Sequence, residues 1–187
     1  LVLDTEVYSN TGGQKSKATP LGAQAKFAPA GKDKEKKDLG RIAMAYKDVY
    51  VASVAQGANM QHCLNALKEA EAHPGPSIII AYTPCIEHHL VHGMKDCMKV
   101  QRLAVETGYW ILYRRNPANV DKPLTIDSRK PSKDPAEYMA TQGRFVALQH
   151  ENPEHAKELQ TRFTHSLAER YEEYQGLAQA MAKKSTN

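Results

Sequence analysis

The sequence that decides the fold is Val49-Tyr50-Val51-Ala52-Ser53-Val54, followed by a helical pattern and then by Ser77-Ile78-Ile79-Ile80-Ala81-Tyr82. Both quoted runs are apolar and rich in β-branched residues, which is typical of buried strands. Asn59 can cap the helix between them, which we expect to continue through Ala72, and the segment 73–76, His-Pro-Gly-Pro, ends it. The predicted buried face of this helix consists of Met60, Cys63, Leu64 and Leu67. A strand, a helix and a second strand of these lengths indicate a parallel βαβ unit, so the predicted fold class is α/β.

The same alternation extends on both sides of this unit. Residues Leu1–Asp4 are interpreted as the end of a buried strand, and Leu39–Tyr46, capped by Asp38, as a short helix. Further along, the pattern predicts a helix from Met94 to about Thr107 and a strand over Tyr109–Arg114. We therefore expect a mainly parallel sheet with helices on both faces.

The pattern changes after residue 116. We interpret residues 1–116 as the C-terminal portion of an α/β domain and residues 117–187 as a loop or hairpin with a helical C-terminal extension of the same domain. Asp134-Pro135 opens one helix, and a long helix is predicted from about Glu154 to Lys183. Its apolar residues recur every three or four positions, namely Leu159, Phe163, Leu167, Tyr171 and Tyr174. Because its charges balance, we expect it to pack against the domain.

Composition excludes several classes of protein. The 187 residues are 41% hydrophobic and 25% charged, which is typical of a globular domain that can bury a core. The longest apolar run is far shorter than the roughly 20 residues that span a bilayer. The net charge of +4 is small and scattered, including the run Lys32–Asp38, which we interpret as solvated, so we expect no nucleic acid as partner. Three cysteines form no disulfide framework, which favours reduced thiols and a cytoplasmic protein.

The first candidate site is the polar segment 4–14, Asp-Thr-Glu-Val-Tyr-Ser-Asn-Thr-Gly-Gly-Gln, directly after a predicted strand. Ligands of open parallel sheets bind beyond the carboxyl ends of the strands. The Thr5 hydroxyl, the Val7 carbonyl and the Asn10 amide offer the oxygens that Mg²⁺ prefers, and the two glycines permit close approach of a ligand. The alternative is an ordinary polar connection between a strand and a loop.

The second candidate site follows the strand that ends at Tyr82. It contains Cys85 and three histidines, His88, His89 and His92, with Cys97 shortly after. Three interpretations stay open from the residues alone: a zinc site without standard spacing, a single thiolate ligand of an iron–sulfur cluster, or an inert thiol. Cys63 and Cys97 lie on predicted helical faces, and we interpret both as packing residues.

The segment 4–14, with Ser16-Lys17-Ala18-Thr19-Pro20 behind it, closely resembles the thiamine-diphosphate domain of the pyruvate:ferredoxin (flavodoxin) oxidoreductase family. The resemblance covers nearly the whole chain and is looser after Asn116. Further matches follow in order, namely Lys36-Lys37-Asp38-Leu39, Tyr50-Val51-Ala52, Leu67-Lys68-Glu69-Ala70, Pro74-Gly75-Pro76-Ser77, Ile80-Ala81-Tyr82 with Cys85, and Gly108-Tyr109-Trp110.

This resemblance implies specific roles for four residues. The Thr5 hydroxyl and the Val7 carbonyl would be ligands of Mg²⁺, and Asn10 would lie beside the thiazolium of thiamine diphosphate and the substrate. Cys85 would be a ligand of the 4Fe-4S cluster nearest the thiamine, with three further cysteines supplied from elsewhere. The inert-thiol interpretation is thereby displaced, and no zinc is needed at the histidines.

The resemblance also implies an activity and partners. Members oxidatively decarboxylate pyruvate with coenzyme A to acetyl-CoA and CO₂, pass electrons through iron–sulfur clusters to ferredoxin or flavodoxin, and are typically dimeric. The family's Gly-Asp-Gly segment, which holds Mg²⁺ and the diphosphate, does not occur in these 187 residues. The opening at Leu1, without an initiator Met, suggests a segment of a longer protein, and we expect it to be inactive alone. Two alternatives are a related 2-oxoacid:ferredoxin oxidoreductase and a non-catalytic α/β binding or assembly module.

Overall fold

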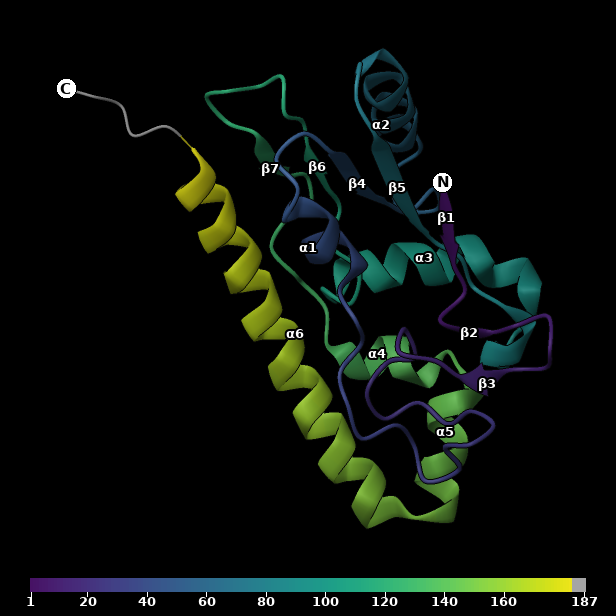
Figure 1. The fold of residues 1–187 in the computed structure, drawn as a ribbon. Coiled ribbons are helices and arrows are strands. Elements are labelled where there is room, and N and C mark those ends of the chain that lie inside the picture. The colour runs from purple at the N-terminus through teal and green to yellow at the C-terminus, as the bar shows by residue number, and fades with distance from the viewer. Residues whose placement is uncertain (183–187) are drawn as a thin grey trace.

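A computed structural model describes residues 1–182 and contains one five-stranded sheet with helices on both faces (Figure 1). The strand order is β1 (Val2–Asp4), β5 (Ser77–Tyr82), β4 (Tyr50–Val54), β6 (Tyr113–Arg115) and β7 (Leu124–Ile126). The first three strands in this order are parallel, whereas β6 and β7 are antiparallel to their neighbours. The predicted α/β class is confirmed, with a parallel core and an antiparallel margin.

The predicted strand over Tyr109–Arg114 is wrong in its bounds. The observed strand is β6, Tyr113–Arg115, and it runs antiparallel to β4 in a sheet that was expected to be mainly parallel. Gly108, at φ 77°, ends the preceding helix, and the next side chains turn into the core. There Tyr109 stacks on Tyr138 with 4.4 Å between ring centroids, and the backbone N–H of Trp110 donates to the Ala104 carbonyl of the preceding helix at 2.8 Å. The buried side chains of Tyr109 and Trp110 thus occupy the start of the predicted strand, and the observed strand begins only at Tyr113.

Three helices connect the parallel strands and their neighbours. They are α1 (Leu39–Met44), α2 (Met60–Ala72) and α3 (Cys97–Glu106), the last preceded by a 3₁₀ turn at Met94–Asp96. The predicted caps are confirmed, because the Asp38 carboxylate accepts from the Arg41 N–H at 2.9 Å and the Asn59 side chain accepts from the His62 N–H at 2.9 Å. Helix α1 ends two residues earlier than predicted, and the bounds of α2 agree with the prediction.

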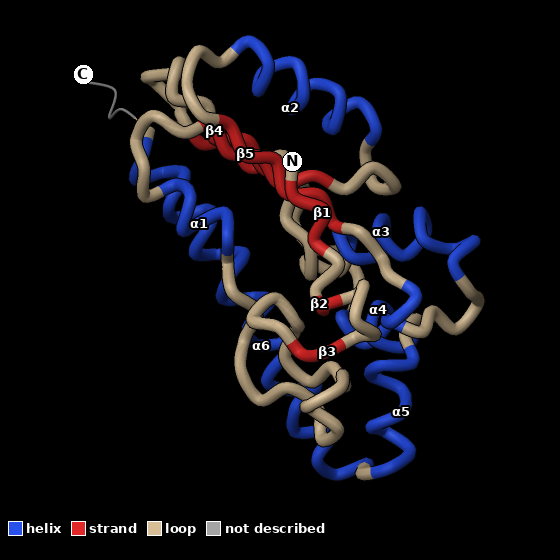
Figure 2. The backbone as a smooth tube through the Cα atoms, turned by 45° about the vertical axis from the view of Figure 1, so that its right-hand side comes forward, coloured by secondary structure: helices blue, strands red, loops and turns tan. Residues whose placement is uncertain are grey.

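The two faces of the sheet are covered by different helices (Figure 2). Alternate residues of β4 point to opposite faces, so that Ala52 packs toward α2 while Val51 packs toward α1 and the C-terminal helix. The predicted buried face of α2 is largely wrong. Cys63 is buried together with His62 and Ala66, whereas Met60, Leu64 and Leu67 are each more than 40% exposed. Short residues bring α2 close to the sheet, and the larger apolar side chains remain on its outer side.

The helical extension consists of α4 (Pro135–Ala140), α5 (Gly143–Glu151) and α6 (Pro153–Met181). The predicted apolar face of α6 is confirmed, because Leu159, Phe163, Leu167 and Tyr174 are buried and Tyr171 is partly buried. The predicted end at Lys183 lies outside the described residues. The main hydrophobic cluster joins residues from both sides of position 116, such as Tyr82 and Phe163. No helix within residues 1–182 has the length and apolar character needed to cross a bilayer.

The N-terminal strand differs from its prediction in burial. Strand β1 lies at the edge of the sheet, and Leu1 and Leu3 are 78% and 61% exposed, so this strand is not buried in the described structure. A small antiparallel pair follows, formed by β2 (Val7–Tyr8) and β3 (Gln14–Lys15). This pair carries the first candidate segment away from the edge of the main sheet.

Candidate functional site

The two candidate segments meet at the carboxyl ends of neighbouring parallel strands. Asp4, the last residue of β1, is in register with Tyr82, the last residue of β5. Immediately beyond, the Thr83 backbone N–H donates to the Asp4 carbonyl at 3.1 Å. The loops that begin at Thr5 and Thr83 therefore lie side by side, at the position where open parallel sheets bind ligands.

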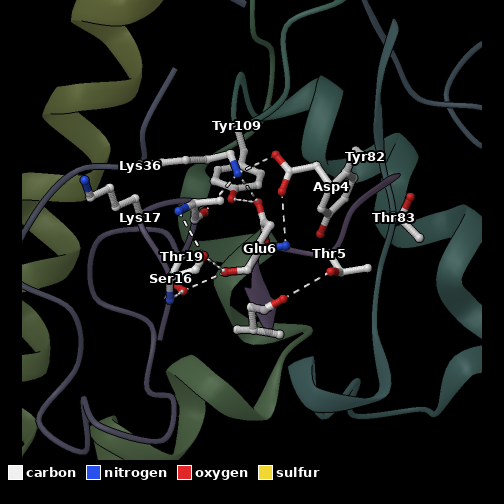
Figure 3. A network of polar contacts seen from close by, with 12 residues as sticks. Asp4, Thr5, Glu6, Ser16, Lys17, Thr19, Lys36, Tyr82, Thr83 and Tyr109 are labelled. Atoms are coloured by element: carbon white, nitrogen blue, oxygen red, sulfur yellow. Dashed lines mark hydrogen bonds and ion pairs between the residues drawn. The ribbon is translucent and has the colours of Figure 1, made fainter. Parts of the chain in front are cut away.

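Two of the predicted site oxygens are close together. The Thr5 hydroxyl donates to the Val7 carbonyl at 3.2 Å (Figure 3), and both residues line an open pocket of about 450 Å³ with Tyr8, Lys17 and other residues. Neighbouring ligands of an octahedral Mg²⁺ at 2.0–2.1 Å lie roughly 3 Å apart. The spacing of these two oxygens and their shared opening thus fit a magnesium ion and the phosphate oxygens that accompany it.

Asn10 occupies a different position from these two residues. It lies in the turn between β2 and β3, is exposed, and is not part of the pocket that Thr5 and Val7 line. The glycines that follow are required by the turn itself, because Gly12 and Gly13 have φ angles of 95° and 82°. A Cβ on Gly13 would also lie 2.4 Å from the Glu87 carboxylate, so this residue joins the two candidate loops closely.

Glu6, between Thr5 and Val7, is the buried centre of the site. Its φ angle of 64° is unusual for a residue with a side chain. Glu6 borders the same pocket as Thr5 and Val7, but its carboxylate is buried. The carboxylate accepts from Arg144 Nη2 at 2.6 Å and from the Tyr109 hydroxyl, and Lys36 Nζ lies 3.5 Å away. The backbone carbonyl of Glu6 is held as well, because two hydroxyls donate to it, from Ser16 and Thr19.

Electrostatics keep this buried carboxylate ionised. Burial alone would raise the pKa of Glu6, but the charges of Arg144 and Lys36 outweigh that effect and lower the pKa to about 2. The opposite balance holds at Asp4, where burial outweighs the Lys36 charge at 2.7 Å and raises the pKa of the carboxyl. The centre of the site therefore holds a fixed negative charge surrounded by positive ones.

The interpretation of residues 32–38 as a solvated run is wrong at two positions. Lys36 is mostly buried and pairs with Asp4 and Glu6. Lys32 is only 6% exposed, and its Nζ donates to the carbonyls of Lys17, Thr19 and Glu35. Burial lowers the pKa of Lys32 to about 8. The alternating charges of this run predicted side chains in solvent. In the structure the chain folds back, so that the ammonium groups of Lys32 and Lys36 reach buried oxygens.

Cys85 and His88 form the second half of the site. Cys85 is 8% exposed and precedes the 3₁₀ turn Ile86–His88. Its N–H donates to His88 Nδ1 at 3.4 Å, and His88 Nε2 lies 2.9 Å from the Thr5 carbonyl. Burial, followed by the nearby Arg144 charge, lowers the pKa of His88 to about 3. The imidazole is therefore neutral at physiological pH.

The structure does not support the zinc interpretation. Among residues 1–182, no three His, Cys, Asp or Glu side chains are close enough together to hold a metal ion. His88 points inward while His89 is exposed, so these neighbouring side chains diverge. Cys63 is buried on the sheet-facing side of α2 and Cys97 is half-buried at the start of α3, as expected for packing residues. Cys85 is thus the one cysteine of the described chain beside the Thr5 loop.

Sequence reasoning missed Glu6, His88 and Arg144 as parts of the site. Glu6 stood inside the quoted motif, and its position between two candidate ligands was a signal that could have been used. His88 was weighed only as a zinc ligand. Arg144 is 138 residues away from Glu6 in the chain and follows no recognisable motif.

Comparisons with known proteins identify the type of domain. Residues 1–81 match the family described as thiamine pyrophosphate enzyme, C-terminal TPP binding domain. The chain is 52% identical over 181 residues to a pyruvate-flavodoxin oxidoreductase of Trichormus variabilis, which covers 95% of this chain and 15% of that protein. It is 46% identical over 182 residues to the pyruvate:ferredoxin oxidoreductase of Moorella thermoacetica, covering 96% of this chain and 15% of that protein.

A third relative carries a different name. The mitochondrial pyruvate dehydrogenase [NADP(+)] of Euglena gracilis is 44% identical over 177 residues, covering 93% of this chain and 10% of that protein. The chain thus spans no more than about a sixth of the length of these relatives. The resemblance found in the sequence is confirmed: this chain corresponds to a segment of the pyruvate-flavodoxin and pyruvate:ferredoxin oxidoreductase family, and the match to the C-terminal TPP binding domain falls on residues 1–81.

Proposed function

We propose that this chain supplies one side of the thiamine diphosphate site of an enzyme that oxidatively decarboxylates pyruvate and passes the electrons to ferredoxin or flavodoxin. The observation that carries the proposal is the Thr5–Val7 turn, whose hydroxyl and carbonyl lie 3.2 Å apart at the mouth of one pocket. Thr5 and Val7 are proposed as two ligands of Mg²⁺, and Asn10 as a residue beside the thiazolium and the substrate. Cys85 is proposed as the one ligand that this segment gives to a 4Fe-4S cluster.

Thiamine diphosphate, when bound, supplies the carbanion chemistry of decarboxylation. The residues of this chain then have a positioning role. Thr5 and Val7 would fix the metal and through it the diphosphate. Lys17 and Lys37 line the pocket together with Asp4 and Glu6, and their ammonium groups would contact the anionic oxygens of the ligand. Cys85, directly behind the Thr5 loop, would place an electron acceptor near the cofactor. The remaining ligands of Mg²⁺ and of the 4Fe-4S cluster would come from the rest of the enzyme. The same proposal includes coenzyme A as a substrate and a homodimer of the whole enzyme.

Replacing Thr5 with valine in the full-length enzyme should weaken metal-dependent binding of the cofactor. Valine keeps the shape but removes the oxygen, so the Mg²⁺ concentration that gives half-saturation with thiamine diphosphate should rise at least about tenfold. Calorimetric titration with Mg²⁺ at fixed thiamine diphosphate measures this. Thr164→Val on the exposed face of α6 is the matched control. An unchanged Mg²⁺ requirement in Thr5→Val would contradict the assignment.

Replacing Cys85 with serine in the full-length enzyme should reduce the content of one cluster, because serine provides no thiolate to the iron. Iron analysis and the electron paramagnetic resonance (EPR) spectrum of the reduced protein measure this loss. Cys97→Ser, at the start of α3, should leave both unchanged. Full cluster content in Cys85→Ser would remove Cys85 from the proposed ligands.

Two other functions are tested by the same protein. The described residues contain no feature that selects the side chain of a 2-oxoacid, so a related 2-oxoacid:ferredoxin oxidoreductase is the second candidate, and assays with several oxoacids distinguish the two. One relative is named for NADP⁺ and not for flavodoxin or ferredoxin, so the same assays should include NADP⁺ as an electron acceptor. The third candidate is a non-catalytic α/β module. It would be favoured if the 187-residue chain were stable alone and if neither this chain nor the full-length protein bound thiamine diphosphate or a cluster.

A further inference from the structure

One buried imidazole ring connects the two halves of the site. The His88 side chain is fully buried, with Nε2 2.9 Å from the Thr5 carbonyl and Nδ1 3.4 Å from the Cys85 nitrogen. A backbone carbonyl can only accept and a backbone N–H can only donate. Nε2 therefore carries the proton and Nδ1 the lone pair, and a single tautomer satisfies both contacts.

The polar groups around His88 already have other hydrogen-bond partners. Glu6 Oε2 lies 3.9 Å from Nε2, beyond hydrogen-bond distance, and that carboxylate is already bonded to Arg144 and Tyr109. Arg144, in turn, donates to Glu6, Gln142 and Tyr138. The ring of His88 is thus held between the backbones of Thr5 and Cys85 by a shell of mutually bonded groups.

We propose that His88 is a positioning residue that fixes the backbone of Thr5 relative to the backbone of Cys85, and with it the geometry between the cofactor site and the cluster ligand. This inference rests on the proposed function, because it takes Thr5 and Cys85 as ligands. Side chains that are themselves held by hydrogen bonds commonly orient the ligands of a metal. Here one side chain would orient ligands of two different groups.

Two substitutions separate the two contacts of the ring. The amide of glutamine stands as many bonds from Cβ as Nε2 does, so His88→Gln can keep the donor to Thr5 while losing the acceptor for Cys85. The amide of asparagine corresponds to Nδ1, so His88→Asn can keep the acceptor for Cys85 while losing the donor to Thr5. His89→Asn is the matched control, since His89 is exposed and its φ of 52° suits asparagine.

The experiment measures both sites in the full-length protein that carries this segment. One readout is the Mg²⁺ concentration that half-saturates thiamine diphosphate binding, and the other is the EPR spectrum and midpoint potential of the reduced cluster. His88→Asn should raise the Mg²⁺ requirement at least about tenfold with little change in the cluster. His88→Gln should alter the cluster signals and keep the Mg²⁺ requirement within about twofold of wild type.

Several outcomes overturn the inference. If both readouts stay at the wild-type values in both variants, or if both change together in each variant, His88 does not position the two sites separately. Wild-type protein without a cluster or without Mg²⁺-dependent binding overturns the proposed function as well, and this result is visible before any variant is made.

If a His88 variant does not fold, the inference can still be tested by hydrogen exchange on wild-type protein. Mg²⁺ and thiamine diphosphate together should slow hydrogen exchange of the peptide that contains the Cys85 amide by at least about fivefold, because binding at Thr5 would hold His88 in place. Exchange that does not respond to the cofactor overturns the inference.

Discussion

Replacing Glu6 with glutamine should lower the free energy of unfolding of the 187-residue chain by about 3–5 kcal/mol. The substitution keeps the size of the side chain and removes its charge. Arg144, which is 2% exposed, then loses the carboxylate 2.6 Å from its Nη2 and remains charged in the interior. Lys36 is affected less, because Asp4 remains 2.7 Å from its Nζ. Urea unfolding followed by circular dichroism measures the difference.

Matched substitutions test whether the buried charge causes this loss. Glu172→Gln on the exposed side of α6 should change the free energy of unfolding by less than about 0.5 kcal/mol. Adding Arg144→Met to Glu6→Gln should recover part of the lost stability, because the unpaired guanidinium is then absent. A loss below about 1 kcal/mol in Glu6→Gln alone would show that Arg144 is solvated or paired in another way.

Acidic pH should reduce the difference in unfolding free energy between wild type and Glu6→Gln. The ordinary pKa of glutamate is 4.5 and that of folded Glu6 is about 2, so the folded state favours the ionised form. Its contribution to stability is complete above pH 4.5 and is lost as the pH falls toward 2. The gap in unfolding free energy between wild type and Glu6→Gln should therefore narrow as the pH falls from 4.5 to 2. A constant gap over this range would show that the ionised Glu6 carboxylate does not stabilise the folded chain.

The sequence was sufficient for the parts of the fold that depend on local patterns. Helix α2 was predicted from a cap at Asn59 and a Pro-Gly-Pro stop after His73, and both signals act within a few residues. The loop at Thr5 was predicted as a candidate site because polar oxygens follow a strand directly, which is again a local arrangement, and its role stays a prediction. The apolar side of α6 was predicted from its spacing in the same way.

The missed features depend on residues that are distant in the sequence. Glu6 looks like an ordinary polar loop residue until Arg144 and Tyr109 are brought to it by the fold. Lys32 and Lys36 were assigned to solvent because their sequence neighbours are charged, although the partners that bury them lie up to 32 residues away. The strand at Tyr113 was displaced by aromatic packing with helices that come later in the chain. No window of a few residues contains this information.

Replacing Phe163 with alanine should cost about 3–5 kcal/mol of unfolding free energy, the usual range for a buried phenylalanine. Phe163 is 2% exposed on α6, and its ring centroid lies 5.6 Å from that of Tyr109 and 5.8 Å from that of Phe145. The cavity would form directly behind the tyrosine whose hydroxyl donates to Glu6. Calorimetric and urea unfolding of the 187-residue chain measure the loss.

This prediction also tests whether residues beyond the matched domain support the site. The family match ends at residue 81, and both Phe163 and Arg144 lie far beyond it. Phe163 packs against the Tyr109 ring, and Arg144 donates to the Glu6 carboxylate. Phe27→Ala is the matched control, since that ring is 80% exposed and should contribute less than about 0.5 kcal/mol. If Phe163→Ala behaved like Phe27→Ala, α6 would be dispensable for the core. The expected large loss would instead mean that packing of the helical extension against Tyr109, the partner of Glu6, stabilises the whole chain.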